Sequence, residues 1–401
     1  MDDQRVTIIG GGPVGAAFAC ALAEQKISSR IIDRTPLGFF LSDENSDCRA
    51  IALSPSSKNF LHHLGIWESI KPTVCSIDQV KTVHGPTNTT VRFDPSASDP
   101  LGYIIPLSLL RQKIAQRVKT FADRIEWVEG TLGSLEKQGP FITVHLNDGR
   151  FFKSSILVGA DGKGSFVRKL GAFETIEHPY GKDAIVCTYE HKNNHENIAW
   201  EIFREDGPLA LLPMTHNRSS LVWSVDHTIA ESLREASDED FDQILSHELS
   251  PYLEQSKRVS PRWIYPLSLQ FVDHSAKEGI FLIGDAAHVI HPLAGQGVNL
   301  GLRDAATLAE VLIEGAQVGL LLSDSTICQK YERWRRFDVF SMILATDGLE
   351  ALFSNHNPLI KKMRDIGLKM VDRNKGLKRL LSKSAMGTLG NLPRALKEKV
   401  S

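Results

Sequence analysis

Short apolar runs that stop at a glycine or an acidic residue recur along the chain. Val6–Ile9 stops at Gly10, Arg30–Asp33 ends in an acid, and Ile280–Ile283 stops at Gly284. Runs of this length predict buried strands, and the helical spacing of apolar residues after the first and third runs predicts strand-turn-helix units. Such units form open α/β sheets that bind ligands at the carboxyl ends of their strands.

Weaker polar–apolar alternation elsewhere predicts a second, antiparallel sheet. It covers 74–100 and 184–225, and a further β-rich stretch at 127–157 contains the turn signal Asn147-Asp-Gly149. Helical spacing predicts helices at 55–64, 108–121, 231–253 and 331–353, with Ser108 as a helix N-cap.

The composition is that of an ordinary globular protein. Of the 401 residues, 42% are hydrophobic and 23% are charged, and no apolar run approaches the roughly 20 residues that a membrane-spanning helix needs. Five scattered cysteines without a C-x-x-C pair favour reduced thiols over disulfides or a zinc site. We therefore expect a cytoplasmic protein without a bound metal ion.

The charges are unevenly distributed. The net charge is −2, but residues 361–401 hold 12 basic and 3 acidic side chains, which leaves 34 basic and 45 acidic residues in the rest. An acidic body argues against nucleic acid as a partner. Residues 360–399 place apolar residues at helical spacing among Lys and Arg. This fits either an amphipathic helix on an anionic membrane or partner protein, or a helix packed on its own domain.

The segment after the first strand carries a dinucleotide-binding pattern. Gly10, Gly12 and Gly15 match G-x-G-x-x-G, and Asp33 ends the second strand at the distance expected for a ribose-binding carboxylate. The pattern does not distinguish FAD from NAD. The predicted contacts in this region are Gly10, Gly12, Pro13, Val14, Gly15, Asp33 and Arg34.

A longer motif follows the strand Ile280–Ile283. Asp285 stands at its carboxyl end, and Pro292, Gly295 and Gly297 punctuate a loop that leads into a helix. Free backbone N–H groups at the start of a helix suit a negatively charged group, such as the ring of a reduced flavin.

The run from His291 to Asp304, after Gly284-Asp285, resembles the second flavin motif of FAD-dependent aromatic hydroxylases of the p-hydroxybenzoate-hydroxylase type. More narrowly, it resembles the ubiquinone-biosynthesis hydroxylase family. Gly159-Ala-Asp161-Gly162 resembles the Asp-Gly motif of flavin hydroxylases, and Phe203–Met214 also matches the family. The resemblance covers nearly the full length, from Val6 to about Gly387.

The resemblance implies roles for residues of all three motifs. Asp285 would contact a ribityl or ribose hydroxyl of FAD, and the loop with Pro292, Gly295, Gln296 and Gly297 would face the isoalloxazine. Two alternatives remain open: Asp285 could simply cap the turn, and Arg49 and Arg111 could be surface arginines without a cofactor role. The implied contacts with FAD are Arg49, Arg111, Asp161, Gly162, Asp285, Gly295, Gly297, Val298 and Asn299.

The implied fold is α/β (α+β), with a Rossmann-like FAD-binding domain interleaved with an antiparallel-sheet substrate domain and followed by a helical tail. The FAD-binding parts are expected at 1–73, 101–180 and 276–345, the substrate parts at 74–100 and 181–275, and the basic helical tail at 346–401. Four residues could line an apolar pocket between sheet and flavin or simply belong to the core: Phe203, Leu211, Met214 and Trp223.

The implied reaction is hydroxylation of a polyprenylated phenol of ubiquinone biosynthesis. Flavin reduced by NAD(P)H or a protein donor reacts with O₂ to a C4a-hydroperoxide, which attacks an electron-rich ring. Because the implied substrate is very apolar, the 360–399 tail is expected to contact the inner face of a membrane or other proteins of the pathway.

Two alternatives remain open. One is another flavin enzyme, such as a polyprenyl reductase or a halogenase, although the sequence lacks the W-x-W-x-I-P segment of halogenases. The other is a non-catalytic FAD-binding subunit of a biosynthetic complex.

Overall fold

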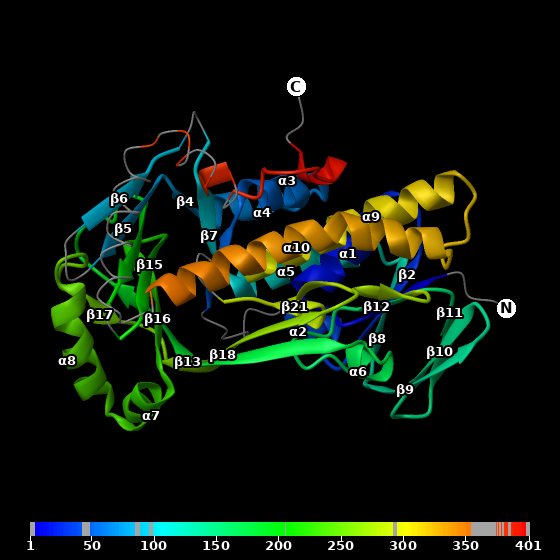
Figure 1. The fold of residues 1–401 in the computed structure, drawn as a ribbon, viewed down its shortest axis with the longest axis horizontal. Coiled ribbons are helices and arrows are strands. Elements are labelled where there is room, and N and C mark those ends of the chain that lie inside the picture. The colour runs from blue at the N-terminus through cyan, green and yellow to red at the C-terminus, as the bar shows by residue number, and fades with distance from the viewer. Residues whose placement is uncertain are drawn as a thin grey trace.

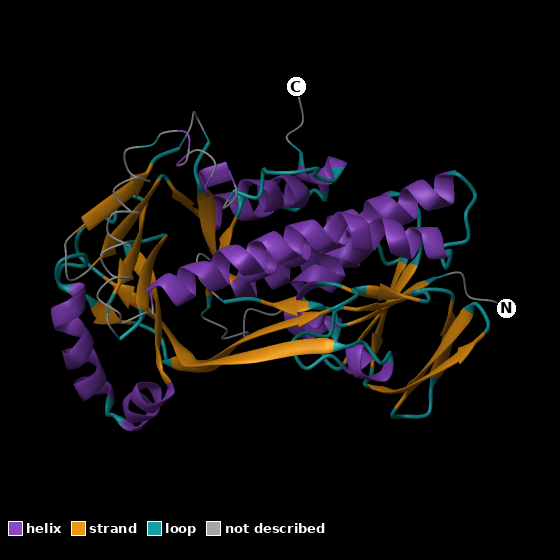
Figure 2. Cartoon of the chain, viewed as in Figure 1, coloured by secondary structure: helices purple, strands orange, loops and turns teal. Residues whose placement is uncertain are grey.

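Two sheet-based bodies lie side by side and are joined by two long strands and a long helix (Figure 1). The computed structural model describes residues 5–41, 49–84, 89–95, 99–204, 206–291, 295–353, 374, 376, 378, 381–383 and 386–397. Figure 2 shows helices over one side of the first body and mostly strands in the second.

The first body is built on a six-stranded sheet of order β19-β20-β12-β1-β2-β8. Its strands are β1 (Val6–Ile9), β2 (Ser29–Asp33), β8 (Ile125–Glu129), β12 (Leu157–Gly159), β19 (Ala276–Lys277) and β20 (Ile280–Leu282). All neighbours pair in parallel except β19 and β20, so the three strands predicted from apolar runs end at the same edge.

Helices cover one face of this sheet because their apolar stripes meet the apolar side chains of β1 and β2. Phe18, Leu308 and Tyr331 are buried in one core with Ile8 and Ile31. The helices of this body are α1 (Pro13–Glu24), α2 (Leu37–Leu41), α3 (Pro55–His63), α4 (Trp67–Ile70), α5 (Leu107–Thr120), α6 (Phe166–Leu170), α9 (Gly297–Gln317) and α10 (Ser325–Phe353), with a 3₁₀ turn at Lys71–Thr73.

A small antiparallel sheet covers the other face. It consists of β9 (Leu132–Gln138), β10 (Phe141–Leu146) and β11 (Phe151–Ser154). Val144 and Leu146 pack in one cluster with Ile9, Ile32 and Leu157. The turn predicted at Asn147–Gly149 lies between β10 and β11, with Gly149 at φ +90°.

The second body is the predicted second sheet, which is antiparallel except for the parallel pair of β5 and β14. Its strand order is β21-β18-β13-β16-β15-β14-β5-β6, with β17 beside β13. The strands are β5 (Gln79–His84), β6 (Thr89–Phe93), β13 (Thr175–Glu190), β14 (Ile198–Phe203), β15 (Pro208–Met214), β16 (Arg218–Asp226), β17 (Lys257–Arg258), β18 (Trp263–Val272) and β21 (His288–Val289). The expected boundary at 180/181 falls inside β13, which runs from one body to the other.

Two helices bury the outer face of this sheet. From α8 (Asp238–Leu249), Phe241 packs in one cluster with Leu211 and Trp223, alongside α7 (His227–Glu235). Leu211 and Trp223 therefore belong to the core and do not line a pocket on the inner face, because the pleat points them toward α8.

The inner face of the sheet meets a third, three-stranded sheet of β3 (Ala50–Leu53), β7 (Gly102–Pro106) and β4 (Cys75–Ile77). Ala199 packs there with Ala52 and Ile104, and Leu212 and Met214 border the same cluster. Strand β7 leads directly into α5, whose preceding residue is Pro106. The predicted N-cap at Ser108 is therefore wrong, since Ser108 already lies within the first turn.

The last described segment packs on the first body. The 3₁₀ turn Arg394–Leu396 buries Leu396 against the core of α3, and Asn59 donates a hydrogen bond to its carbonyl oxygen at 3.2 Å. This part of the predicted basic tail lies on its own domain. The amphipathic pattern predicted from Ile360 to Leu381 falls outside the described residues except for Leu381, which is 42% exposed.

Candidate functional site

The first glycine turn lies at the carboxyl edge of the six-stranded sheet. The backbone N–H of Gly11 donates to the Asp33 carboxylate at 2.6 Å, so the end of β2 fixes the turn after β1. A Cβ on Gly10 would lie 2.3 Å from the carbonyl oxygen of Ala160, and one on Gly15 would lie 2.1 Å from that of Gly10. These two glycines allow close backbone packing, as the fingerprint predicts.

Other glycines at the same edge border open space. A Cβ on Gly12, Gly162 or Gly297 would meet no atom within 4 Å. Gly12 is the N-cap residue of α1, Gly297 is the first residue of α9, and Gly162 lies in the loop between β12 and α6. The absence of a side chain at each position lets a ligand approach the backbone, and the two helix starts suit an anionic group. The residues present therefore fit FAD, with its pyrophosphate at the start of α1.

The Asp161 carboxylate is already engaged within the protein. It accepts hydrogen bonds from the Ser165 hydroxyl at 2.5 Å and from the backbone N–H groups of Phe166 and Val167 at 2.7 and 3.2 Å. Asp161 thus stabilises the start of α6. The adjoining Gly162, at φ +81°, leaves its backbone open to a cofactor.

Asp285 projects from a tight turn at the end of β20. Gly284 adopts φ +60°, which favours glycine, and Gly284–Ala286 forms a 3₁₀ turn. The Asp285 side chain is exposed, but the surrounding protein atoms remove part of the hydration of its carboxylate. This desolvation raises its pKa, and the nearby His288 and Arg49 oppose the rise. An exposed carboxylate at the carboxyl end of a strand fits a hydroxyl-binding role.

A buried charge network holds this turn in place. The Asp304 carboxylate accepts hydrogen bonds from the Gly284 N–H at 2.9 Å, from His288 Nε2 at 2.6 Å and from Arg335 Nε at 2.6 Å. Asp338 also binds Arg335 and, at 2.7 Å, Arg303. Burial alone would raise the pKa of Asp304, but His288 and Arg335 lower it below its usual value.

Asp304 lies at the end of the flavin motif identified in the sequence, but no role was predicted for it. Arg335 was not predicted as a site residue. Their spacing of 31 residues gives no local signal. The one usable clue was an acid and an arginine within otherwise apolar helical stretches, which require partners when buried.

Asn299 ties the flavin loop to the start of α3. Its side-chain oxygen accepts from the backbone N–H of Ser54 and the hydroxyl of Ser57, both at 2.8 Å. Its amide donates to the carbonyl oxygens of Ala52 at 2.7 Å and Gly295 at 3.3 Å. Asn299 therefore positions the loop through these bonds.

The structure describes three of the remaining predicted loop residues but not Pro292. Gln296 is buried just before α9, Gly297 is its first residue, and Val298 is half-buried beside the core. The predicted Pro292 lies outside the described residues.

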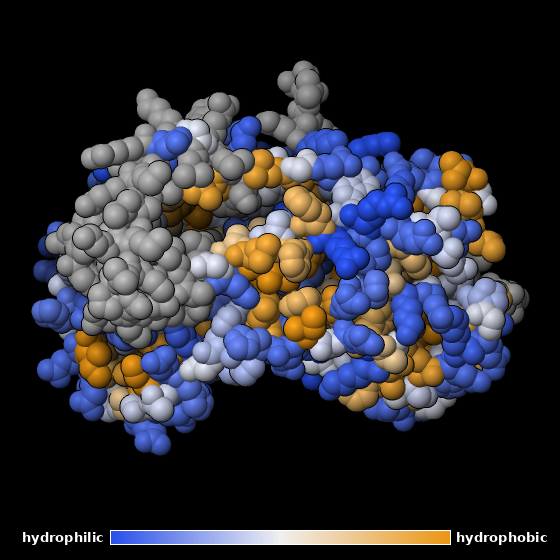
Figure 3. Space-filling view, in the orientation of Figure 1, coloured by the Kyte–Doolittle hydropathy of each residue, from blue (hydrophilic) through white to orange (hydrophobic). Residues whose placement is uncertain are grey.

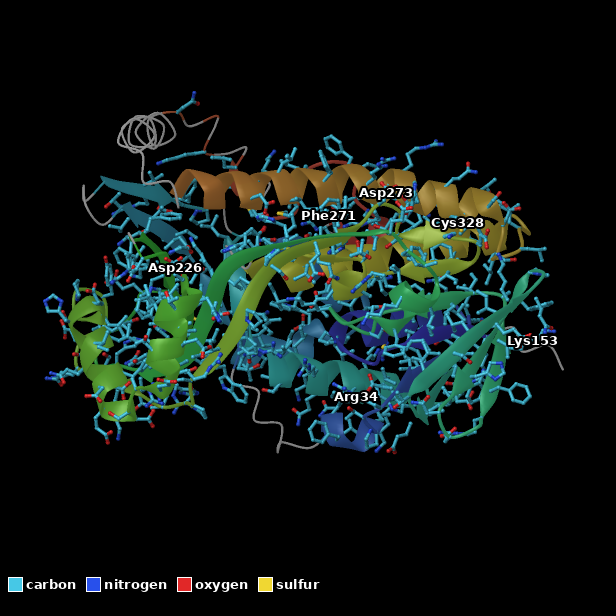
Figure 4. The ribbon with its side chains drawn as sticks, turned by 60° about the horizontal axis from the view of Figure 1, so that its bottom comes forward. Arg34, Lys153, Asp226, Phe271, Asp273 and Cys328 are labelled. Carbon is cyan, nitrogen blue, oxygen red and sulfur yellow. The ribbon has the colours of Figure 1, made fainter. Side chains whose placement is uncertain are left out.

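The predicted arginines lie at different places in the first body. Arg49 lies over the ring of Tyr265 at 5.2 Å, where the strand β18 of the large sheet approaches β3. Arg111 is half-buried on α5. Arg34 follows β2, is exposed (Figure 4), and borders a cavity of about 660 Å³ with Trp127 and Arg150. Of the predicted cofactor contacts that the structure describes, only Arg34 lines this cavity, and the glycine turns do not border it.

The inner face of the large sheet carries a row of half-buried side chains. Glu201 pairs with Ala210, which pairs with Val222, and Leu212 follows on the same face. Burial raises the pKa of Glu201 to about 7. Ala199, two residues before it, packs with Ala52, which in turn lies 3.2 Å from a Cβ built on Gly295. This face therefore lies near the flavin loop and combines apolar side chains with one carboxyl group.

The expectation of no bound metal ion wrongly assumed that the sequence has no H-x-x-x-H pair, a spacing typical of metal ligands, since His191 and His195 have it. His191 bonds the carbonyl oxygen of Asn193 at 2.9 Å and the Ser219 hydroxyl at 3.0 Å. His195 bonds the carbonyl oxygen of Met214 at 2.7 Å and the N–H of Asn197 at 3.0 Å. All four ring nitrogens thus have partners within the protein.

Comparison with known proteins agrees with this geometry. The family model described as "FAD binding domain" matches residues 3–332. Over 96% of its length the chain is 36% identical to the ubiquinone hydroxylase UbiL of Rhodospirillum rubrum, covering 90% of that protein. It is 30% identical to the 3-demethoxyubiquinol 3-hydroxylase of Escherichia coli, with 96% of this chain and 98% of that one covered.

The chain belongs to the ubiquinone-biosynthesis family of FAD-dependent hydroxylases. The resemblance drawn from the sequence is confirmed, and FAD is the cofactor of this monooxygenase. Solved structures agree on the fold. The p-nitrophenol 4-monooxygenase PnpA of Pseudomonas putida superposes with a TM-score of 0.80 at 15% identity, over 97% of this chain and all of that one. The flavin-dependent brominase Bmp2 gives a TM-score of 0.78 at 14% identity, over 96% and 93%. The fold alone therefore does not decide between oxygenation and halogenation.

Within the described part of the chain, every helix is too short or too polar to cross a membrane.

Proposed function

We propose that this chain hydroxylates the aromatic ring of a polyprenylated phenol or quinol in ubiquinone biosynthesis, with NAD(P)H or a protein donor as the source of electrons. The observation that carries this proposal is the 36% identity to a ubiquinone hydroxylase across nearly the whole chain. The meeting of three flavin motifs at one sheet edge supports it.

The binding roles follow from the geometry of that edge. The turn from Gly10 to Gly15 accommodates the pyrophosphate of FAD, and Asp33 fixes this turn and lies beside the ribose. Asp285 binds a hydroxyl of the ribityl chain, and the loop at Gly295–Gly297 lies beside the flavin ring. In this arrangement 1–73, 101–180 and 276–345 bind FAD, while 74–100 and 181–275 bind substrate.

The phenol lies between the flavin loop and the inner face of the large sheet. Ala210, Leu212 and Val222 give this face an apolar surface that excludes water from the reacting ring. Glu201 is the carboxyl group on this face and binds the phenolic hydroxyl. The bound flavin supplies the oxygen chemistry, and the chain supplies orientation and a dry site.

The experiment is a reaction under ¹⁸O₂ with purified holoprotein, NADPH and a short-chain polyprenylphenol. Label in a hydroxylated product supports the proposal. Flavin reduction without label would instead favour a reductase, and bound flavin without substrate-stimulated NADPH oxidation would favour a non-catalytic subunit. The variant Asp285→Ala is expected to lose flavin, whereas Asp273→Asn, an exposed acid after β18 (Figure 4), serves as the matched control.

A contact of residues 360–399 with the cytoplasmic face of an anionic membrane or with other proteins of the pathway completes the proposal. The excess of basic residues in this segment supports it.

A further inference from the structure

The outer face of α10 exposes large apolar side chains in a row. Phe337, Phe340 and Leu344 are 80%, 54% and 60% exposed. With Arg333 they are spaced i, i+4, i+7 and i+11, so they lie on one face of the helix. Scattered exposed apolar residues need no explanation, but a stripe of three on one helix marks an interaction surface.

The acidic residues of α10 between Tyr331 and Gly348 all point inward. Glu332 accepts hydrogen bonds from the hydroxyl of Ser275 at 2.8 Å and the N–H of Ala276 at 2.9 Å. Asp338 belongs to the buried network with Arg303. Asp347 accepts a hydrogen bond from the Tyr180 hydroxyl. None of these carboxylates contributes negative charge to the outer face.

The charges of the outer face are positive. Arg333 and Arg336 are exposed and form no ion pair with any described residue. Figure 3 shows hydrophobic residues gathered over the middle of α10, with hydrophilic residues toward its N-terminal end. The inner face is fully used, since Met342 and Ile343 pack in one cluster with Leu269 and Phe271 of β18 (Figure 4). The stripe can therefore be covered without disturbing the fold.

We propose that the outer face of α10, formed by Arg333, Arg336, Phe337, Phe340 and Leu344, docks on an anionic phospholipid membrane. A helix that lies in the membrane interface needs an apolar face and neighbouring cations, which pair with anionic headgroups. The choice of a membrane over a protein partner rests on the proposed function, because a polyprenylated substrate is dissolved in the bilayer. The docked α10 places the enzyme beside that source.

The test is co-sedimentation of the full-length holoprotein with vesicles of phosphatidylglycerol and phosphatidylcholine, compared with vesicles of phosphatidylcholine alone. The wild type is expected to bind the anionic vesicles and to be released by salt. The variant Phe337→Ser/Phe340→Ser is expected to weaken binding roughly tenfold or more. Arg333→Gln/Arg336→Gln is expected to weaken it by a similar factor, since each cation near the surface contributes several-fold.

Matched controls distinguish binding through this surface from non-specific binding through other exposed apolar or basic side chains. Val318→Ser/Leu321→Ser removes two apolar side chains that are 74% and 75% exposed between α9 and α10. Lys119→Gln/Lys192→Gln removes two exposed cations elsewhere. Both controls should bind vesicles like the wild type. If they lose binding as much as the α10 variants do, or if the α10 variants bind normally, the proposal is overturned.

Two further outcomes are distinct. In the first, the protein does not bind vesicles but forms a dimer that the Phe337→Ser/Phe340→Ser variant does not form. This result would show that the stripe contacts a second copy of the chain and would overturn the membrane proposal. Hydroxylation of a water-soluble phenol analogue is measured in parallel, because it does not require docking. Its absence, with vesicle binding intact, would refute the proposed function and leave the docking surface standing.

Discussion

At the scale of single residues, the glycines of the first motif divide into two kinds. Gly10 is needed by the protein itself, because a Cβ would lie 2.3 Å from a backbone oxygen at φ +104°. Gly12 borders open space and has an ordinary backbone conformation. One fingerprint therefore combines a folding requirement with a ligand requirement.

The first prediction separates these two roles. Gly12→Ala should leave the unfolding free energy of the apoprotein within about 0.5 kcal/mol. It should weaken FAD binding at least tenfold, because the methyl group enters the open space where the pyrophosphate is proposed to bind. Gly10→Ala should destabilise the apoprotein by about 2–4 kcal/mol. Urea unfolding and titration calorimetry with FAD measure both. Equal loss of stability in the two variants would contradict this division.

The second prediction concerns Glu201, whose pKa burial raises from 4.5 to about 7. Because the folded state holds the proton more tightly than the unfolded state, Glu201 stabilises the fold below about pH 4.5. This contribution is lost as the pH rises through about 7. The shift corresponds to roughly 3 kcal/mol in a dry interior, and the partial exposure of the side chain reduces the expected effect to about 1–2 kcal/mol.

Glu201→Gln should therefore gain about 1–2 kcal/mol relative to the wild type between pH 5 and pH 8, as measured by urea unfolding of the apoprotein. Glu254→Gln, at an exposed position, should follow the wild type at both pH values. A constant difference between Glu201→Gln and wild type across this range would show that the carboxyl group titrates normally.

At the scale of elements, the turn at Gly284–Ala286 depends on α10, a helix that contains none of the predicted cofactor contacts. Asp304 on α9 holds the turn after β20, and Arg335 on α10 holds Asp304. Removing one partner of a buried pair leaves the other uncompensated.

The third prediction follows from this chain of contacts. Asp304→Asn should destabilise the apoprotein by about 3–5 kcal/mol at pH 7 and weaken FAD binding through the turn at Gly284. Since the pKa of Asp304 is lowered, its contribution is present above about pH 4 and is lost as the pH falls through its folded value. The difference between variant and wild type should thus shrink in acid. A difference in urea midpoint that is unchanged from pH 7 to below pH 4 would contradict this role.

The elements differ in how far the sequence predicts them. The apolar runs predict β1 and β2 correctly because a buried parallel strand is a short continuous pattern. The sequence does not predict which side chains lie on which face of the large sheet. Leu211 and Leu212 are neighbours, but one packs under α8 and the other faces the flavin loop. Which face is inward follows only from the register between strands, and a network such as Asp304 with Arg335 follows only from the packing of α9 on α10.

At the scale of the whole molecule, the two bodies depend on segments that return to each other from far along the chain. Strands β13 and β18 pair along most of their length and join the bodies, and α10 lies across both (Figure 1). The cofactor edge itself combines residues from β1, β12 and β20. This edge is therefore complete only when most of the chain has folded.

The last prediction uses the end of the chain. Leu396 is 1% exposed and packs in the core that also contains Val6 from the first strand, so segments far apart in the sequence share one core. Leu396→Ala should lower the unfolding free energy by about 2–4 kcal/mol, because it leaves a cavity beside α3. Leu389→Ala, at a position 38% exposed in the same segment, should change it by less than about 1 kcal/mol. If urea unfolding showed the two variants to be alike, the terminal segment would be an attachment to the surface. If only Leu396→Ala is destabilised and FAD restores part of the loss, the terminal segment and the cofactor stabilise the same cooperative unit.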